Sequence, residues 1–436
     1  MYFLRPQALK AWRTAAALTL LGSLAMAIQA QTAAGCAPAA FANLPVVDTG
    51  LPVVQIWTNA AAPVLNRDDY VLACMRVTDG SQNSYKAGLF HGTIKIKGRG
   101  NSTWSLPKKG YRLKLDAAAE VLDMPAHKDW VLLANHFDKS LLRNDVGMEL
   151  SRRVGLPWTP RLRFAEFYLN NQFLGNYQIG EKIEIAPQRV AITPMAKTYL
   201  TLPNLSGGYL IEADFEVRID KLKDSWFKTD EPLNFVLQDP SGLTVPLAQY
   251  NYISAYTRNA ENALRARSGA ADLIDIDSFI DWWIVMEVMK NADAAMASSV
   301  YVVKDRDKKM AMGPVWDFDI GAGNMVLNAP TLYPKGWYLR DYSSWHDFLL
   351  HDPANWKRAK DRWIKVRASL KDITRYIDER ERLIQKSQQL NFEVWPILNK
   401  RYWPNPAALG SHQAEVKYLK EWLKDRIDWM DKNIGK

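Results

Sequence analysis

Hydrophobic and polar residues alternate with a period of two through much of the first half of the chain. The stretches "GTIKIKGRG" (92–100) and "GYRLKLD" (110–116) show this alternation, and a loop rich in Gly, Ser and Pro separates them. Alternation of this kind is typical of half-buried β-strands. The segment 161–185 predicts two strands joined by an Asn-Asn-Gln turn, and "GGYLIEAD" (207–214) predicts one more. The pattern therefore predicts a β-rich first half.

Helical periodicity dominates the second half of the chain. The expected helices cover 251–267, 275–291, 354–369, 371–390 and 411–433. Asp277 is the expected cap of the second of these helices, and Ser411 is the expected cap of the last. An earlier helix is expected within 138–155, where Asp138 or Ser140 serves as the cap and Gly155 ends it. A hairpin over 298–319 interrupts the helical half. This order of elements predicts the α+β fold class, with a β-rich first lobe and an α-rich second lobe.

The first thirty residues differ from the rest in composition. Three basic residues precede an apolar stretch (14–30) that ends in small residues, as in a secretory signal peptide, and this stretch is too short for a stable membrane span. We therefore expect an exported protein that is periplasmic, extracellular or bound at the cell surface. The expected parts are a signal peptide (1–30), a β-rich extension (31–90), a nucleotide-phosphate region (91–185), a lobe with catalytic and metal loops (186–350) and a helical region (351–436).

Charge and cysteine content add two further expectations. The net charge is +9, and removing the three basic residues of the signal leaves about +6, which is compatible with a phosphate ligand or an acidic partner. Cys36 and Cys74 are the two cysteines, and in an oxidising compartment one disulfide between them is the default interpretation. The alternative is a lipid attached to Cys36. Two cysteines and six scattered histidines do not favour a zinc site.

The loop between the first two alternating stretches has the composition of a phosphate-binding loop. Gly100, Asn101 and Ser102 follow Arg99, and small residues of this kind let backbone N–H groups approach an anion. Five cations lie within sixteen residues: Arg99, Lys108, Lys109, Arg112 and Lys114. A solvated basic hairpin is the competing interpretation, and no Walker pattern is present.

Two later stretches carry acidic residues in positions that suit catalysis or metal binding. Asn291 and Asp293 follow an amphipathic helix and precede a strand, where an Asp can accept a hydroxyl proton or hold a metal. Asp317 and Asp319 flank Phe318 in "GPVWDFDIGAGN" (313–324), and paired carboxylates suit Mg²⁺, which prefers oxygen ligands. Capping and local hydrogen bonds are the competing explanations for both stretches. The order of loop, helix, strand pair, Asp loop and Asp-Phe follows the logic of a phosphotransferase.

Five motifs in this order resemble those of the CotH kinase family of atypical secreted or spore-coat protein kinases. They are "IKGRGNSTWSLPKKGYRLKL", "DWVLLANHFDKSLLRN", "RFAEFYLNNQFLGNYQIGEKIEI", "DIDSFIDWWIVMEVMKNADA" and "GPVWDFDIGAGN". The resemblance runs from about residue 93 to residue 324, and the Trp-rich helical tail also looks like the family. It implies an atypical protein-kinase-like two-lobe fold and ATP-dependent phosphorylation of protein Ser or Thr, assisted by Mg²⁺ or Mn²⁺.

Carried over residue by residue, the resemblance assigns roles. Asp293 is the implied catalytic Asp and Asp317 the chief metal ligand. Asn291 and Asp319 are further candidate metal ligands, since Ser298 stands where ordinary kinases have a metal-binding Asn. The nucleotide-binding candidates are Arg99, Gly100, Asn101, Ser102, Lys109, Lys114, Glu181 and Lys182. Glu149 or Glu166 is the candidate partner of the phosphate-contacting lysine.

The expected partner is a protein with a Ser or Thr acceptor, acidic in character if the net charge is a guide. No nucleic acid and no stable membrane span are expected. Two other functions remain open at this stage. One is a catalytically inactive kinase-like protein that binds partners at the envelope or surface, and the other is the same fold transferring a nucleotidyl group or driving another ATP-dependent transfer.

Overall fold

The computed structural model describes residues 46–81, 88–326 and 329–435. The chain divides into two compact units. The first unit comprises the described residues of 1–98, 111–130 and 165–174, and the second comprises those of 99–110, 131–164 and 175–436. The predicted signal peptide and Cys36 lie outside the described residues, so the signal and the disulfide stay predictions. Cys74, on the second strand, is buried.

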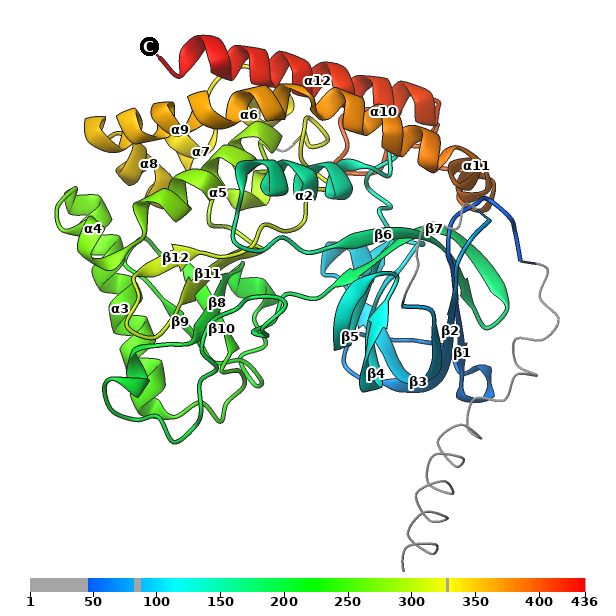
Figure 1. Ribbon diagram of the computed structural model, residues 1–436, viewed down its shortest axis with the longest axis horizontal. Coiled ribbons are helices and arrows are strands. Elements are labelled where there is room, and N and C mark those ends of the chain that lie inside the picture. The colour runs from blue at the N-terminus through cyan, green and yellow to red at the C-terminus, as the bar shows by residue number, and fades with distance from the viewer. Residues whose placement is uncertain (1–45, 82–87, 327–328, 436) are drawn as a thin grey trace, which may run out of the picture. The chain divides into compact units, whose positions relative to one another are not determined.

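Strands of the first half pair into a closed barrel in the order β1-β2-β3-β4-β5-β7-β6 (Figure 1). Their bounds are β1 Val53–Thr58, β2 Val71–Thr78, β3 Phe90–Arg99, β4 Gly110–Val121, β5 Met124–Leu133, β6 Leu162–Leu169 and β7 Gln172–Glu181. β1 pairs antiparallel with β2 and parallel with β6. Ile94 and Ile96 of β3 are fully buried whereas Lys95 between them is exposed, as the alternating pattern predicts.

A second sheet lies wholly within the second unit. Its strand order is β12-β11-β8-β10-β9, with β8 Tyr209–Ala213, β9 Trp226–Lys228, β10 Asn234–Asp239, β11 Val300–Lys304 and β12 Met310–Met312. β8 is flanked on both sides by antiparallel partners, and Tyr301 of β11 lies opposite Glu212 of β8. This central position makes β8 a firm base for the loops that leave its ends.

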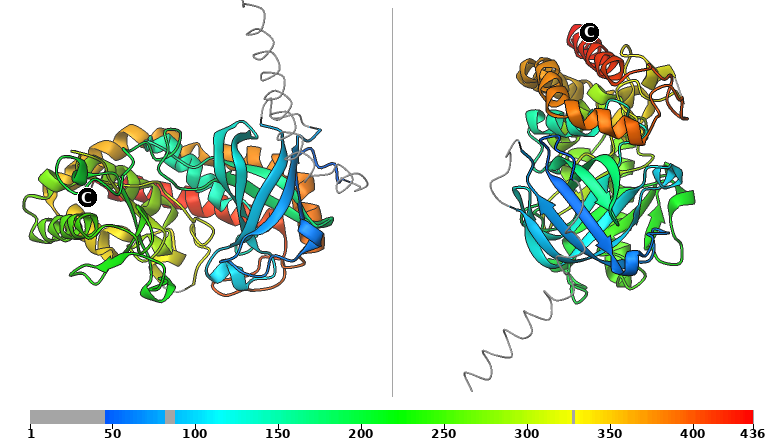
Figure 2. Two further views of the ribbon diagram at one scale, coloured as in Figure 1. Left: turned by 90° about the horizontal axis from the view of Figure 1, so that it is seen from below. Right: turned by 90° about the vertical axis from the view of Figure 1, so that its right-hand side faces the viewer.

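Helices are the main regular structure of the second unit. They are α2 Arg143–Val154, α3 Leu247–Ala266, α4 Ala270–Leu273, α5 Ile276–Met289, α6 Ala329–Leu332, α7 Leu339–Tyr342, α8 Ser344–Leu350, α9 Pro353–Lys371, α10 Ile373–Leu383, α11 Gln385–Val394 and α12 His412–Asn433. Figures 1 and 2 show α9, α10 and α12 side by side, and α2 and α5 pack against α9. α5 supplies the centre of the core, where Phe279, Trp282 and Trp283 are fully buried.

The predicted α+β class is confirmed, with a β-rich N-terminal region and a helical C-terminal region. Two caps differ from the prediction. The side chain of Asp275, not Asp277, accepts the first N–H groups of α5. α2 begins at Arg143, later than predicted, although the Asp138 carboxylate still accepts from the backbone N–H of Arg143. Ser411 caps α12 as predicted. Among the described residues, no helix has the length and apolarity that a membrane crossing requires.

Candidate active site

A small pocket within the second unit brings together residues from several of the predicted motifs. Cationic and polar liners come from the loop after β3 and from the start of α2, and two carboxylates come from the loop after β12. The lining residues are Arg99, Thr103, Lys108, Gly110, Leu132, Leu133, Ala134, Asn135, His136, Asn144, Asp317 and Asp319. Arg99, Asp317 and Asp319 were predicted as site residues, and they meet at this one pocket.

The backbone of the Asp-Phe-Asp loop is held in an unusual conformation. Asp317 has a φ of 66°, in the left-handed region that a non-glycine residue rarely adopts. Its neighbour Phe318 is fully buried against α2, where Gly147 leaves room for the ring. Such strain persists only where the surrounding structure enforces it. The packing of Phe318 therefore fixes the direction in which the chain presents the two aspartates.

A relay of buried amides also holds this loop. The backbone N–H of Phe318 donates to Asn144 Oδ1 at 2.8 Å, Asn144 Nδ2 donates to Asn135 Oδ1 at 2.9 Å, and Asn135 Nδ2 donates to Gln178 Oε1 at 2.9 Å. These amides come from β7, the segment after β5, and α2. Because each member is buried and hydrogen-bonded, the relay fixes the position of the loop rather than merely touching it.

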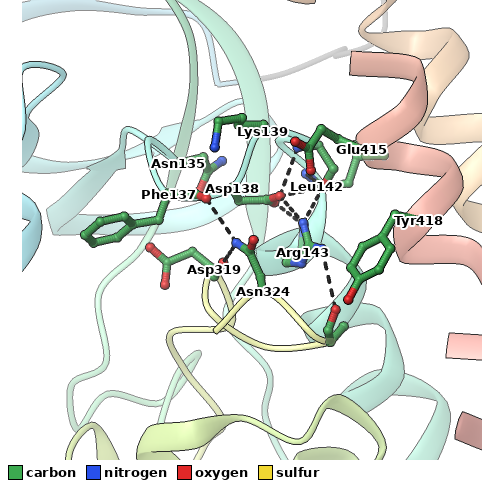
Figure 3. A network of polar contacts seen from close by, with 12 residues as sticks. Asn135, Phe137, Asp138, Lys139, Leu142, Arg143, Asp319, Asn324, Glu415 and Tyr418 are labelled. Atoms are coloured by element: carbon green, nitrogen blue, oxygen red, sulfur yellow. Dashed lines mark hydrogen bonds and ion pairs between the residues drawn. The ribbon is translucent and has the colours of Figure 1, made fainter. Parts of the chain in front are cut away.

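Arg143 clamps the turn that follows the loop (Figure 3). Its guanidinium is fully buried, pairs with the Asp138 carboxylate at 2.6 Å and donates to the carbonyl oxygens of Gly321 and Ala322. Figure 3 also shows Asn324, whose amide donates to the carbonyl oxygens of Phe137 and Asp319. A buried ion pair with satisfied hydrogen bonds is costly to break, so it rigidly connects the Asp138–Arg143 motif to the turn.

Asp319 is buried without a compensating side-chain donor. Its side chain is turned away from the Arg143 clamp in Figure 3, and no side chain among the described residues is seen to donate to its carboxylate. Burial, together with the charges of Asp317, Asp138 and Asp293, raises the pKa of Asp319 well above its ordinary value. Within the part of the chain that the structure describes, no ion pair involves this carboxylate, so burial and its acidic neighbours disfavour the charged form.

Asp293 lies on the loop after α5, in the short 3-10 turn η6 (Ala292–Ala294). Burial raises its pKa to about 6, the charges of Asp317 and Asp214 add to this rise, and Arg218 opposes it. Asn291 connects this loop to the other one, because its Nδ2 donates to the Asp317 carbonyl at 2.9 Å. The amide of Asn291 therefore joins the two acidic loops, and its role as a metal ligand stays a prediction.

Glu212 and Tyr301 form a further titratable pair near the predicted residues. Burial raises the pKa of Glu212 to about 8, and the neighbouring Asp214 and Asp317 also raise it, whereas Tyr301 and Arg99 lower it. The guanidinium of Arg99 lies 5.0 Å from the ring centroid of Trp316. Arg99 is thus a cation set between an aromatic face and the acidic cluster, which suits the binding of a phosphate oxygen.

The structure gives Lys108, Lys109 and Lys114 different surroundings, which the sequence pattern could not distinguish. Lys108 is almost fully buried and lines the pocket, with Nζ donating to the Asn176 carbonyl and to Asn391 Oδ1. Lys109 Nζ donates instead to the Trp104 carbonyl and lies 5.1 Å from the centroid of the Trp104 ring. Lys114 is exposed on β4 of the first unit.

The predicted phosphate loop is a tight turn. Gly100 has a φ of 106°, and a Cβ there would come within 2.0 Å of the Thr103 hydroxyl, so only glycine fits. Asn101 and Ser102 are exposed, and Ser102 opens the short 3-10 turn η3 (Ser102–Ser105). Within 99–103, Arg99 and Thr103 line the pocket.

Glu181 and Lys182 have local partners at the end of β7. The buried carboxylate of Glu181 accepts from the backbone N–H and the guanidinium of Arg161, both at 2.8 Å. Lys182 pairs with Glu184 at 3.0 Å. Glu149 accepts from Arg152 and Arg153 of its own helix, and Glu166 accepts from Thr49 Oγ1.

The acidic residues fit a divalent cation. Asp317 and Asp319 line one pocket, and Asp293 is close enough to Asp317 for the two charges to interact. Oxygen donors of this kind are the ligands that Mg²⁺ and Mn²⁺ take in proteins. Burial and the neighbouring carboxylates raise the pKa of Asp319, and a bound cation would offset the repulsion among these charges.

The family model described as CotH kinase protein matches residues 96–430. The chain belongs to the CotH kinase family. The matched stretch contains Arg99, Asp293 and the Asp-Phe-Asp loop. No curated protein matches the chain. Membership of the CotH kinase family suggests a kinase-like enzyme that uses ATP and a divalent metal, with a protein as its substrate.

Sequence reasoning did not single out several residues that shape the site of this CotH kinase family member. Arg143 and Asn144 lie in the motif "DKSLLRN", where a charged and an amide side chain at the start of an otherwise apolar helix were the available signal. Asp214 directly follows an apolar strand, a common position for functional carboxylates. Lys108 had no signal that distinguished it from Lys109.

Proposed function

We propose that this protein is an exported, ATP-dependent protein kinase that transfers a phosphoryl group to a Ser or Thr hydroxyl, with the two-lobed kinase-like fold that the family resemblance implies. The observation that supports this most strongly is the meeting of Arg99, Asp317 and Asp319 at one pocket, with Asp293 nearby. Phosphoryl transfer depends mainly on positioning and on stabilising charge, and this arrangement offers both.

Each residue has a distinct task in this proposal. Arg99 neutralises the phosphate chain of the nucleotide, and Lys108 adds a second cation to the pocket lining. Asp293 accepts a hydrogen bond from the acceptor hydroxyl and orients it, and its raised pKa of about 6 brings it closer to the range useful for a general base. Asp317 and Asp319 would hold Mg²⁺ or Mn²⁺, which supplies countercharge to the phosphate oxygens when bound.

Buried residues hold the acidic loop in place. Phe318 and the amide relay from Gln178 through Asn135 and Asn144 leave the acidic loop little freedom. Reacting groups held in a fixed geometry lose less entropy in the transition state, which is the main contribution a kinase scaffold makes. The same fixed geometry would let the carboxylates meet a cation without rearrangement.

The test is transfer of labelled phosphate from ATP to casein by the purified protein, with Mg²⁺ or Mn²⁺. We expect transfer by the wild type and a loss of at least about 100-fold in Asp317→Ala and Asp293→Asn. Asp361→Asn is the matched control, because Asp361 is an exposed carboxylate of α9 paired with Lys357, and it should retain wild-type activity.

Intact-mass measurement of the products identifies the group transferred. Addition of a phosphate supports the proposal, and addition of a nucleotide would instead assign a nucleotidyl transfer. Absence of both transfer and ATP binding in the wild type would refute the proposed kinase activity and leave a kinase-like binding protein.

A further inference from the structure

The loop that carries Asp293 has a strained backbone between two fixed points. Lys290, Met296 and Ser299 have positive φ values of 41°, 59° and 56°. The loop folds back on itself, because the backbone N–H groups of Ala297 and Ser298 donate to the Asp293 carbonyl. A loop with this much left-handed backbone keeps one conformation only if its surroundings hold it. Asn291 holds one end through the Asp317 carbonyl.

Ser298 holds the other end through two charged residues. Its hydroxyl donates to Asp214 Oδ1 at 2.7 Å and accepts from Arg218 Nη1 at 2.5 Å. Arg218 and Asp214 are themselves paired at 3.4 Å. Ser298 is almost fully buried, at 2% exposed. Because a hydroxyl has one hydrogen to donate, that hydrogen is committed to Asp214, and the serine acts within the protein rather than toward a ligand.

The bridge connects the loop to the central strand of the sheet. Asp214 directly follows β8, which is paired on both sides, and Arg218 ends the short 3-10 turn η5 (Glu216–Arg218). Hydrogen bonds to charged groups are stronger than those between neutral groups. The three residues therefore fix the loop relative to β8 at Ser298, which lies five residues after Asp293.

We propose that Asp214, Arg218 and Ser298 are positioning residues that hold Asp293 in line with the acceptor hydroxyl. The inference rests on the proposed kinase function, and it assigns to Ser298 a role distinct from metal binding. The bridge acts on Asp293, so its loss should lower turnover while leaving nucleotide binding intact. If the three residues only stabilised the fold, their loss would lower stability, turnover and nucleotide affinity together.

The experiment compares Ser298→Ala with Ser254→Ala, in the purified full-length protein. Ser254 is a matched control, because it is also buried and donates only to a carbonyl of its own helix, α3. Phosphate transfer from Mg²⁺–ATP to casein gives kcat and the KM for ATP, and hydrogen–deuterium exchange reports the mobility of 291–299. We expect Ser298→Ala to lower kcat about 100-fold, with the KM for ATP within about twofold of wild type. Exchange in 291–299 should rise in this variant alone.

Two substitutions of Arg218 test whether a cation at this position is sufficient to hold Ser298. Arg218→Lys keeps a cation that can donate to Ser298 and should retain more activity than Arg218→Ala. Unchanged exchange in 291–299, or a kcat for Ser298→Ala equal to that of Ser254→Ala in an active wild type, would overturn the inference. If exchange rises as expected but the wild type transfers no phosphate, the bridge stands as a brace of the loop and the proposed kinase activity fails.

Discussion

Gly147 lies inside α2, where a Cβ would come within 2.3 Å of the Phe318 ring. Glycine in a helix interior ordinarily lowers stability by about 1 kcal/mol relative to alanine. Its presence here is explained by the close approach of the ring that sets the direction of Asp317. The helix thus accepts a weak helix-former so that the loop can pack against it.

Gly147→Ala should therefore destabilise the protein, in contrast to the usual effect of this substitution in a helix. Overpacking of a buried site costs about 1–3 kcal/mol, which outweighs the gain in helix propensity. Urea unfolding measures the change. Phe318→Leu in the same background should recover part of the loss, and a stabilised Gly147→Ala variant would show that the ring can move aside freely.

Single residues also mark the limit of what the sequence predicts. The alternation in "GYRLKLD" correctly predicts that Tyr111, Leu113 and Leu115 are buried. The same pattern cannot distinguish Lys108 from Lys109, because their difference arises from contacts with Asn176 and Asn391, which lie far along the chain. Short-range patterns predict which side of a strand is buried, whereas long-range packing decides which cation lines a pocket.

At the scale of elements, α12 supports the site from outside the predicted motifs. Tyr418 donates to the Gly323 carbonyl just after the Asp-Phe-Asp loop, and Trp422 donates to the Leu332 carbonyl. Arg426 pairs with Glu287 of α5 at 2.5 Å, and both side chains are fully buried. The sequence predicts the helix and its Ser411 cap, but it gives no sign that this helix braces the loop.

Arg426→Ala should be strongly destabilising, because it leaves the Glu287 carboxylate buried without its partner. Breaking a buried pair in this way costs about 3–5 kcal/mol. Lys417→Ala is the control on the same helix, since Lys417 and Glu421 form an exposed pair worth less than about 1 kcal/mol. Chemical denaturation compares the two. Equal effects would mean that the buried pair contributes no more than a surface pair.

At the scale of the whole molecule, acidic groups with raised pKa values make stability depend on pH. A carboxyl whose folded pKa lies above its unfolded value binds its proton more tightly in the folded state. Stability from such a group is present at low pH and is lost as pH rises through the folded pKa. Glu212, with a pKa of about 8, and Asp293, with a pKa of about 6, both act in this direction.

We therefore expect the free energy of unfolding, measured in EDTA, to contain a component that falls between about pH 5 and pH 8. Glu212→Gln removes part of it, so the variant should gain stability relative to wild type across this range, by at most about 5 kcal/mol. Mg²⁺ should reduce the loss in the wild type by neutralising the acidic cluster. A difference between the two proteins that is independent of pH would contradict this assignment.

The contact between His412 and the Ser140 carbonyl joins positions 272 residues apart in the sequence. Ser140 belongs to the segment from which Arg143 donates to the turn after the acidic loop, so the contact with α12 supports that segment. A nascent chain cannot form this contact until α12 has left the ribosome. The long separation of the two partners therefore means that this segment gains its contact with His412 only after α12 has been synthesised.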